Sequence, residues 1–347
     1  MTYERTIEHL HAKRLVWHYT TLDALQLILE SRTLLATEVN YQNDPREPET
    51  ANDVIEEALR GLSKDSEYAA FSRSALQWFK TYRENNGFID GRSGALIGES
   101  RFIFCASSDP DNLYAWRTYA AASRTGCAIG LDPEVPLGLV GDPNVTASVN
   151  YSRWSDVIYD PLELAGFAAD KLKGVADLWN RVNAEDSDDA KRQEQQGTPE
   201  HEIEYRDHAF GVLITDFSTA TAEITAVAKH ASYAGEHETR LTASPASHAV
   251  VFSPGVDGPR PRVRVASSER WGQVLASAED RLPIRAIVLA PNAGRQALTT
   301  AQWLLYANNY PLDPLPEIDE SREPPLLYHD SSRVVSIVRS AHPYRQV

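Results

Sequence analysis

Three short stretches of this 347-residue sequence combine residue types that catalytic and binding sites use. The first is His18-Tyr19-Thr20, where an apolar strand-like stretch ends and a predicted helix begins at Thr20 or Thr21. An imidazole can donate or accept a hydrogen bond near neutral pH, and a threonine hydroxyl can cap a helix. These side chains therefore either cap and pack a junction or line a pocket, and the local residues leave both open.

The second stretch is SSDPDNLYAWRTYA, residues 107–120, which predicts a strand end, a capping loop and a helix. Trp116 and Tyr119 are three residues apart and are expected to be neighbours on that helix, whereas Tyr114 and Tyr119, five apart, are not. Two neighbouring aromatic side chains can hold a planar ring such as nicotinamide or a base. Core packing explains the same pair equally well.

The third stretch is KHASYAGEHETRL, residues 229–241, in which Glu236, Glu238 and Arg240 alternate. On a strand, alternation places all three on one face. A carboxylate there can hold a sugar hydroxyl and stabilise an oxocarbenium-like centre, as glycosyl transfer requires. The neighbouring guanidinium keeps such carboxylates ionised. A charged ladder on a solvated strand is the alternative interpretation.

Two further stretches carry dense charge. The loop NDPREPE, residues 43–49, has enough acids for a hard cation, but its spacing matches no EF-hand and favours a solvated turn. In PRPRVRV, Arg260, Arg262 and Arg264 alternate, so a strand would present them on one face. They indicate either a charged, solvated edge strand or a face that contacts anions.

Bulk composition limits the class of protein. An apolar content of 42% supports a sizeable core, no apolar run is long enough to cross a membrane, and the charged first residues do not form a signal peptide. Cys105 and Cys127 lie in apolar strand-like runs, which predicts reduced core thiols in a cytoplasmic protein. The net charge of −15 disfavours nucleic-acid binding unless a local basic strip overrides it. We predict no metal site and no membrane partner.

The pattern of elements predicts one α+β domain, residues 1–347, with a mixed or antiparallel sheet and a helical insertion at 155–230. Its acid-rich part, 183–207, is expected to be a solvated loop or a mobile insert. Helices are expected at 50–61, 66–84, 112–123, 160–182, 203–230, 268–280 and 297–309. Strands are expected at 102–106, 127–131, 145–151, 238–243, 248–252, 262–266 and 284–290, and in the closing segments PLLYH and RVVSIV.

Taken in order, several motifs resemble a widespread bacterial family of unknown function. They are HYTT, NDP, FIFCASS, DNLYAW, CAIGLD, a strand with Glu-x-Glu-x-Arg, IVLAP and a terminal PYR. The likeness runs from about residue 15 to 346, interrupted near 155–205. The ordered set identifies a family rather than a chemistry.

A second, more distant resemblance is to the ADP-ribosyltransferases, which have a His on an early strand, aromatic residues around nicotinamide and a catalytic Glu on a later strand. The early unit "HYTT…L..IL.S..L" is similar to the start of the branch that modifies nucleic acids. The resemblance implies a split sheet of that type. It also implies that His18 hydrogen-bonds the ribose of NAD, while Thr20 and the backbone of Tyr19 hold the nicotinamide end.

The same resemblance assigns the remaining site residues. Trp116 or Tyr119 would stack on the nicotinamide ring, and Glu238 would be the catalytic carboxylate that orients the ribose 2′-hydroxyl. Glu236 would steer the acceptor nucleophile, and Arg240 belongs to the same NAD site.

The resulting hypothesis is NAD-dependent ADP-ribosyl transfer by a bacterial toxin or anti-phage effector. NAD would be the substrate and a nucleic acid or a protein the acceptor, with an antitoxin or another defence-system component as a partner. One alternative is a nuclease or nucleotide-processing enzyme that uses the arginine face. The other is a non-enzymatic module of a defence system that senses a ligand.

Overall fold

The computed structural model describes residues 7, 10–42, 47–84, 101–120, 124–144, 150–151, 153–195, 211–244, 249–255, 258–312 and 334–342. The chain has an α+β fold with a mixed parallel and antiparallel sheet, which confirms the predicted fold class at that level. It divides into two compact units. Unit 1 comprises Met1–Glu38, Phe102–Asp156 and Ala234–Val347, and unit 2 comprises Val39–Arg101 and Val157–Tyr233.

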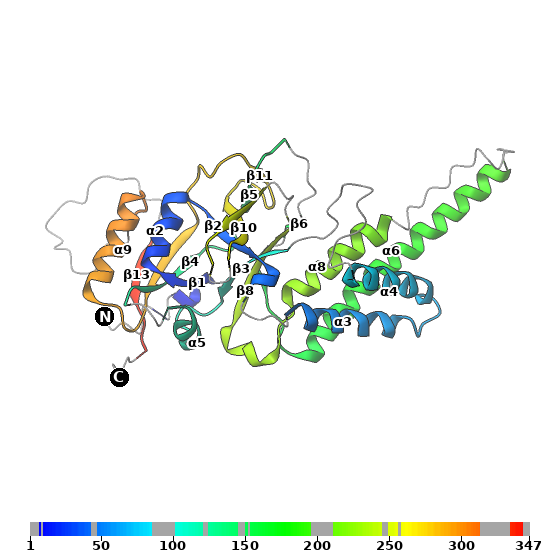
Figure 1. The fold of residues 1–347 in the computed structure, drawn as a ribbon, viewed down its shortest axis with the longest axis horizontal. Helices are drawn as coiled ribbons and strands as arrows, with labels where there is room; N and C mark the ends of the chain where they lie inside the picture. The colour runs from blue at the N-terminus through cyan, green and yellow to red at the C-terminus, as the bar shows by residue number, and fades with distance from the viewer. Residues whose placement is uncertain are drawn as a thin grey trace. The chain divides into compact units, whose positions relative to one another are not determined.

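Unit 1 is built on one large sheet with the strand order β11-β5-β10-β2-β3-β1-β4-β12-β13 (Figure 1). The pairs β12–β13 and β5–β11 are parallel, and the other pairs along this order are antiparallel. The strands are β1 (Val16–Thr21), β2 (Leu34–Glu38), β3 (Phe102–Ser107), β4 (Gly126–Leu131), β5 (Leu137–Val140), β6 (Asn150–Tyr151), β7 (Ser155–Asp156), β8 (Glu238–Ser244), β9 (Val250–Ser253), β10 (Arg260–Ser267), β11 (Val274–Leu275), β12 (Ile284–Leu289) and β13 (Ser336–Arg339).

The sheet divides at β3. One edge of β3 pairs with β2 at Ile103 and with β1 at Ser107, while the other edge pairs with β8 along its whole length. Strand β8 in turn carries the short strands β6 and β7. The division places the ends of β1, β3 and β8 next to one another, although they are far apart in the sequence.

Helices α2 (Leu22–Ser31) and α9 (Arg295–Ala307) lie together on one face of this sheet, which we call the α2 face (Figure 1). The Thr21 hydroxyl caps α2 by accepting from the backbone N–H of Ala24, and Leu25 and Leu29 are buried. The opposite face, called the α5 face, is covered by the segment from α5 (Leu113–Ala115) through the π-helical turn Trp116–Ala120.

Unit 2 is helical. Its elements are η1 (Val39–Tyr41), α3 (Glu47–Leu62), α4 (Ala69–Glu84), α6 (Pro161–Gln195), the π-helical turn η3 (Leu213–Phe217) and α8 (Ser218–Val227). They pack around a core that includes Phe71, Leu172 and Phe217. The predicted insertion at 155–230 falls almost wholly in this unit, which also takes in residues 39–101.

The acid-rich segment 183–207 was predicted to be a loop, and for residues 183–195 this is wrong. Helix α6 continues to Gln195. Its distal part is rich in Ala, Glu, Lys, Gln and Arg, which are strong helix formers, and i,i+3 ion pairs join Lys191 to Asp188 and Arg192 to Asp189. The loop was predicted because this segment has few apolar residues. An exposed continuation of a helix that is already packed against a core does not need apolar residues, only residues with high helix propensity.

The prediction of a helix at 268–280 is also wrong, because bends, a turn and β11 occupy that stretch. In the segment 43–49, which was predicted to be a turn, residues 47–49 already belong to α3. The remaining segments match their predicted type in the parts that are described. The predictions for 43–46, 145–149, 196–210 and PLLYH lie outside the described residues. Neither Cys105 nor Cys127 forms a disulfide, and Cys127 is buried as predicted, whereas Cys105 is only partly buried. Among the described helices, none combines the length and the apolarity that a membrane crossing requires.

Candidate functional site

The helix predicted at 112–123 begins as predicted but continues as a π-helical turn. The Asn112 side chain caps α5 by accepting from the N–H of Ala115 at 3.0 Å, and residues 116–120 form the π-helical turn. A π-helix bonds residues five apart, so it changes which side chains share a face. Tyr114 and Tyr119, 40% and 39% exposed, both reach the segment 235–236. The sequence, taken as a regular α-helix, placed them apart.

Trp116 does not pair with Tyr119 at the surface. Its side chain is only 3% exposed, and its ring meets Tyr19 edge-on with centroids 4.6 Å apart. The indole Nε1 donates a hydrogen bond of 2.7 Å to Asp111 Oδ1. Both the ring and its polar atom are therefore engaged within the protein. In this structure Trp116 anchors the π-helical turn and offers no surface on which a ligand can stack.

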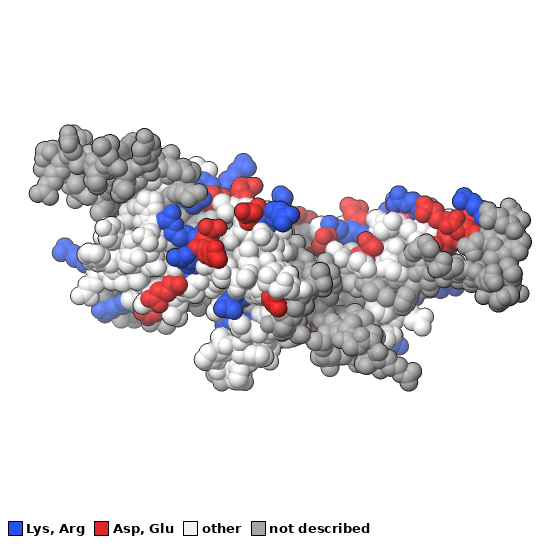
Figure 2. Space-filling view, turned by 90° about the horizontal axis from the view of Figure 1, so that it is seen from above, with Lys and Arg blue, Asp and Glu red and all other residues white. Residues whose placement is uncertain are grey.

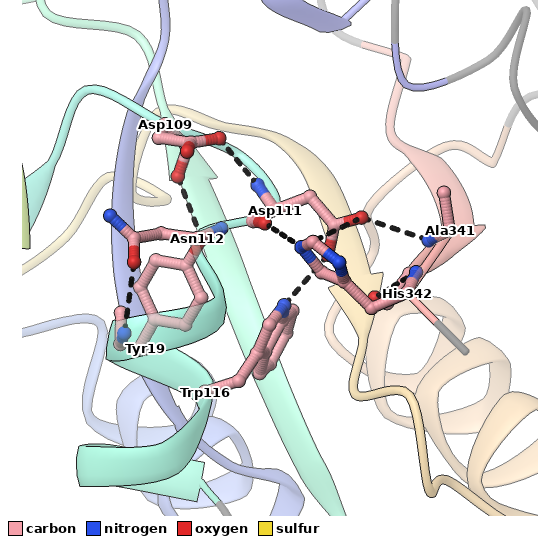
Figure 3. A network of polar contacts seen from close by, with 9 residues as sticks. Tyr19, Asp109, Asp111, Asn112, Trp116, Ala341 and His342 are labelled. Carbon is pink, nitrogen blue, oxygen red and sulfur yellow. Dashed lines mark hydrogen bonds and ion pairs between the residues drawn. The ribbon is translucent and has the colours of Figure 1, made fainter. Parts of the chain in front are cut away.

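A buried polar network fixes the loop before α5 (Figure 3). The Tyr19 hydroxyl donates to the carbonyl of Asp109 and accepts from the N–H of Asn112, each at 2.7 Å. The Asp109 carboxylate accepts from the N–H of Asp111 at 2.9 Å. Burial raises the pKa of Tyr19 well above its usual range, so the phenol stays a neutral donor. Tyr19 thus acts by positioning the loop rather than by offering a group to solvent.

The C-terminal segment closes this network. Asp111 Oδ2 accepts from the N–H of Ala341 at 2.8 Å, and Nε2 of His342 lies 2.6 Å from the carbonyl of Asp111 (Figure 3). Asp111 therefore joins the π-helical turn, through Trp116, to the residues after β13. Sequence reasoning missed this role, although Ser-Ser-Asp-Pro-Asp-Asn is a run of residues that hydrogen-bond local backbone.

The same loop holds the backbone just before β8. The carbonyl of Gly235 accepts a hydrogen bond from Asn112 Nδ2 at 2.8 Å. The carbonyl of Glu236 accepts one from Ser107 Oγ at 2.8 Å, and the carbonyl of His237 accepts one from the N–H of Ser108 at 2.8 Å. His237 has φ of 49°, a left-handed conformation that is uncommon for a residue with a Cβ. Strained backbone of this kind is retained where its surroundings hold it, and it clusters at functional sites.

This geometry corrects the predicted Glu-x-Glu-x-Arg strand. Glu236 ends the 3-10 helix η4 (Ala231–Glu236), and β8 begins only at Glu238. The left-handed His237 between them breaks the alternation that the prediction required. Glu236 and Glu238 consequently occupy different settings, and only Glu238 shares a strand face with Arg240.

Glu236 pairs with a tyrosine at the surface. The Tyr119 hydroxyl donates to Glu236 Oε1 at 3.2 Å. Glu236 is 7% exposed, whereas Tyr119 is 39% exposed. The result is a recessed carboxylate beside two accessible aromatic side chains, Tyr114 and Tyr119. Such a carboxylate can accept hydrogen bonds from hydroxyl groups or balance a developing positive charge.

Glu238 and Arg240 form a buried ion pair. Arg240 Nε donates to Glu238 Oε1 at 2.9 Å and Nη2 donates to Oε2 at 3.1 Å, and the side chains are 4% and 1% exposed. This two-point geometry engages both carboxylate oxygens. The arrangement matches a structural role for the pair at the start of β8.

His18 and Glu238 are not brought together. The register pairs Trp17 with Ser107 and Ser107 with Glu238, so these three share the α5 face and His18 points to the other. There its ring lies 4.5 Å from that of Phe104, and its Nδ1 is 3.1 Å from the carbonyl of Cys105. Desolvation, and secondarily the charge of Arg262, lower the pKa of His18, although the Cys105 contact opposes this.

Thr20 also lies apart from the Glu236 site, because it alternates with His18 along β1 and thus faces the α2 side. Of the residues predicted to form one pocket, the structure brings together Tyr119 and Glu236, Tyr19 and Trp116, and Glu238 and Arg240. No group of three or more His, Cys, Asp or Glu within the described ranges is arranged to hold a metal ion.

Unit 1 is thus an α+β unit with a mixed sheet. Its tyrosine–carboxylate pair, Tyr119 and Glu236, lies next to the start of β8, where the sheet divides. Comparisons with protein-family models, with curated proteins and with solved structures found no match to this chain. What the site does must therefore be argued from its geometry.

Proposed function

We propose that unit 1 is an NAD-dependent ADP-ribosyltransferase that modifies a macromolecular acceptor. The observation that carries the proposal is the hydrogen bond from the Tyr119 hydroxyl to the recessed carboxylate of Glu236, beside the exposed ring of Tyr114. This combination offers aromatic surface for nicotinamide and a carboxylate for the attached ribose. The early unit "HYTT…L..IL.S..L", which resembles the start of one branch of the ADP-ribosyltransferases, supports the same chemistry.

Glu236 is a better catalytic carboxylate than Glu238. Both oxygens of Glu238 are bonded to Arg240, so using Glu238 would require breaking a buried ion pair. Glu236 is instead held by a tyrosine that is itself accessible. The carbonyl hydrogen bonds on residues 235–237 keep the Glu236 backbone in place, as preorganised electrostatic catalysis requires.

The reaction breaks the bond between nicotinamide N1 and the ribose carbon C1′, and the bonding electron pair leaves with neutral nicotinamide. Glu236 orients a ribose hydroxyl and stabilises the positive charge that develops on the ribose. The acceptor nucleophile then forms a bond to C1′ and releases its proton to the Glu236 carboxylate or to water. Tyr119 keeps the carboxylate oriented, and the rings of Tyr114 and Tyr119 contact the nicotinamide.

The test is nicotinamide release from NAD by the purified full chain, with water replacing the acceptor. Glu236→Gln keeps the shape of the side chain and removes its charge, so we expect a loss of about 10²–10³-fold, as for removal of one electrostatic contact to a transition state. Tyr119→Phe should cost roughly tenfold or more, because a hydrogen bond to a charged group is worth about 1.5–3 kcal/mol.

A matched control separates chemistry from folding. Glu134→Gln makes the same change at an exposed glutamate elsewhere in unit 1, and it should retain full activity. Wild-type protein that neither binds NAD nor releases nicotinamide would overturn the proposal. Equal activity of the Glu236→Gln and Glu134→Gln variants would remove Glu236 from it.

A further inference from the structure

Strand β10 presents a row of three arginines. Arg260, Arg262 and Arg264 alternate with Val263 and Val265, which are completely buried in the core on the α2 face. The arginines therefore point to the opposite face. Arg262 pairs across the sheet with Thr37 of β2 on one side and Val251 of β9 on the other. The strip lies on an interior strand, which corrects the prediction of a charged edge strand.

Within the described residues, no carboxylate neutralises Arg262 or Arg264 of this row. In the part of the chain that the structure describes, neither Arg262 nor Arg264 forms an ion pair, and Arg262 Nε is buried without a hydrogen-bond partner. Desolvation and the charge of Arg260 lower the pKa of Arg262. Arg240 and Arg285, by contrast, pair with Glu238 and Asp132. An anion that approaches Arg262 or Arg264 thus competes with no carboxylate held by that arginine.

The charge of the chain is unevenly divided between its units. Unit 2 contains 26 of the 49 acidic residues but only 15 of the 34 basic ones, so it carries most of the net charge of −15. Acidic side chains gather near the far end of α6, whereas acidic and basic ones are interspersed over unit 1 in the face that Figure 2 draws. The net negative charge of the whole chain therefore does not describe the electrostatic surroundings of β10, which belongs to unit 1.

We infer that the face of β10 bearing Arg260, Arg262 and Arg264 binds single-stranded nucleic acid through its phosphates. Alternate residues of a strand are about 6.7 Å apart, so the guanidinium groups form a straight, regular row that a flexible single strand can follow. Guanidinium groups match phosphate oxygens in a two-point geometry. Leu35, 38% exposed and paired with Arg264, adds apolar surface beside the row.

A single strand fits this surface better than a duplex or an acidic protein segment. Arg264 and Leu35 are exposed on this face of β10, and single strands are bound on exposed sheet surfaces in several nucleic-acid-binding folds. A nucleic acid carries a phosphate at every nucleotide, so it can place one negative charge opposite each arginine of the row. Binding should not depend on base sequence, because the row supplies contacts to phosphates only. The inference does not depend on the proposed NAD chemistry.

The experiment measures fluorescence anisotropy of a labelled oligothymidylate of about 20 nucleotides, longer than the usual single-strand site. We expect full-length protein to bind it with a micromolar Kd at low salt. Three phosphate contacts predict that log K falls with log salt with a slope of about −2, since each single-strand contact contributes about −0.7. Arg262→Gln with Arg264→Gln should reduce the slope to about −0.7 and weaken binding at least tenfold.

Arg285→Gln is the matched control, because it removes the same charge from unit 1 at an arginine already paired with Asp132 at 3.3 Å. It should leave the slope unchanged, as should Glu236→Gln in the separate tyrosine–carboxylate site. If the double variant is less stable, exposed Arg264→Glu alone should still weaken binding. No binding by wild-type protein at low salt, or binding that the β10 variants do not alter, would overturn the inference. Tighter binding to a duplex or to polyglutamate through the same arginines would also contradict it.

Discussion

Replacement of Tyr19 by Phe tests whether the buried network positions the π-helical turn. The change removes one oxygen and keeps the ring that packs against Trp116 with centroids 4.6 Å apart. It deletes two hydrogen bonds, one donated to the carbonyl of Asp109 and one accepted from the N–H of Asn112, both 2.7 Å long. Asn112 is 5% exposed, so water cannot readily replace the lost acceptor.

The expected cost follows from that burial. A buried donor left without its partner costs about 1–3 kcal/mol, and the net value of a lost hydrogen bond is about 1 kcal/mol. Because the Asp109 carbonyl lies in a less buried part of the loop, we assign most of the cost to the Asn112 N–H. We therefore expect Tyr19→Phe to lower the opening free energy of this region by about 2–3 kcal/mol.

Amide hydrogen exchange of peptides from 107–120 measures this opening directly. A change of about 2–3 kcal/mol corresponds to exchange that is roughly 30- to 150-fold faster. Tyr114→Phe is the control, because the structure shows no hydrogen bond from that exposed hydroxyl, and it should change the free energy by less than about 0.5 kcal/mol. Equal exchange rates in the two variants would refute the positioning role of Tyr19.

Three further predictions concern charged and titrating groups. Glu238→Gln removes the charge of the carboxylate that pairs with the buried Arg240 and should lower the free energy of unfolding by about 3 kcal/mol in urea, a loss that Glu238→Leu with Arg240→Met should largely reverse. Desolvation lowers the pKa of His18 in the folded state, so stability should fall as pH drops below about 6.5, and an NMR titration of Arg262→Gln should show the pKa of His18 moving upward. Burial raises the pKa of Tyr310 to about 12, so the stability it contributes below pH 10 should be lost between pH 10 and pH 12, and Tyr310→Phe should remove that part of the alkaline pH dependence.

Most of the secondary structure could be predicted from local pattern. The alternation in FIFCA and CAIGL, and the Thr21 cap with its apolar stripe, are local signals that the fold retains. The failures have local causes as well. Residues 183–195 have high helix propensity but few apolar residues, and 268–280 is polar enough to suggest an exposed helix yet forms bends and a short strand.

The candidate site could be predicted only in part. Residue type drew attention to Tyr119 and Glu236, and the structure joins them by a hydrogen bond although they are 117 residues apart. Periodicity misassigned their neighbours, because it assumed a regular helix through Trp116 and a regular strand through His237. The π-helical turn and the left-handed residue each shift which side chains share a face, and neither has a dependable sequence signal.

The sequence by itself determined the α+β class, the buried stretches, the free thiols and the spacing of the three arginines, because each depends on composition or on neighbours a few residues away. Only the tertiary structure decided which chemistry-bearing residues meet. Strand register assigned His18 and Glu238 to opposite faces, and strand order made β10 an interior strand. Pairing between distant strands sets both, and a shift of one residue would exchange the faces.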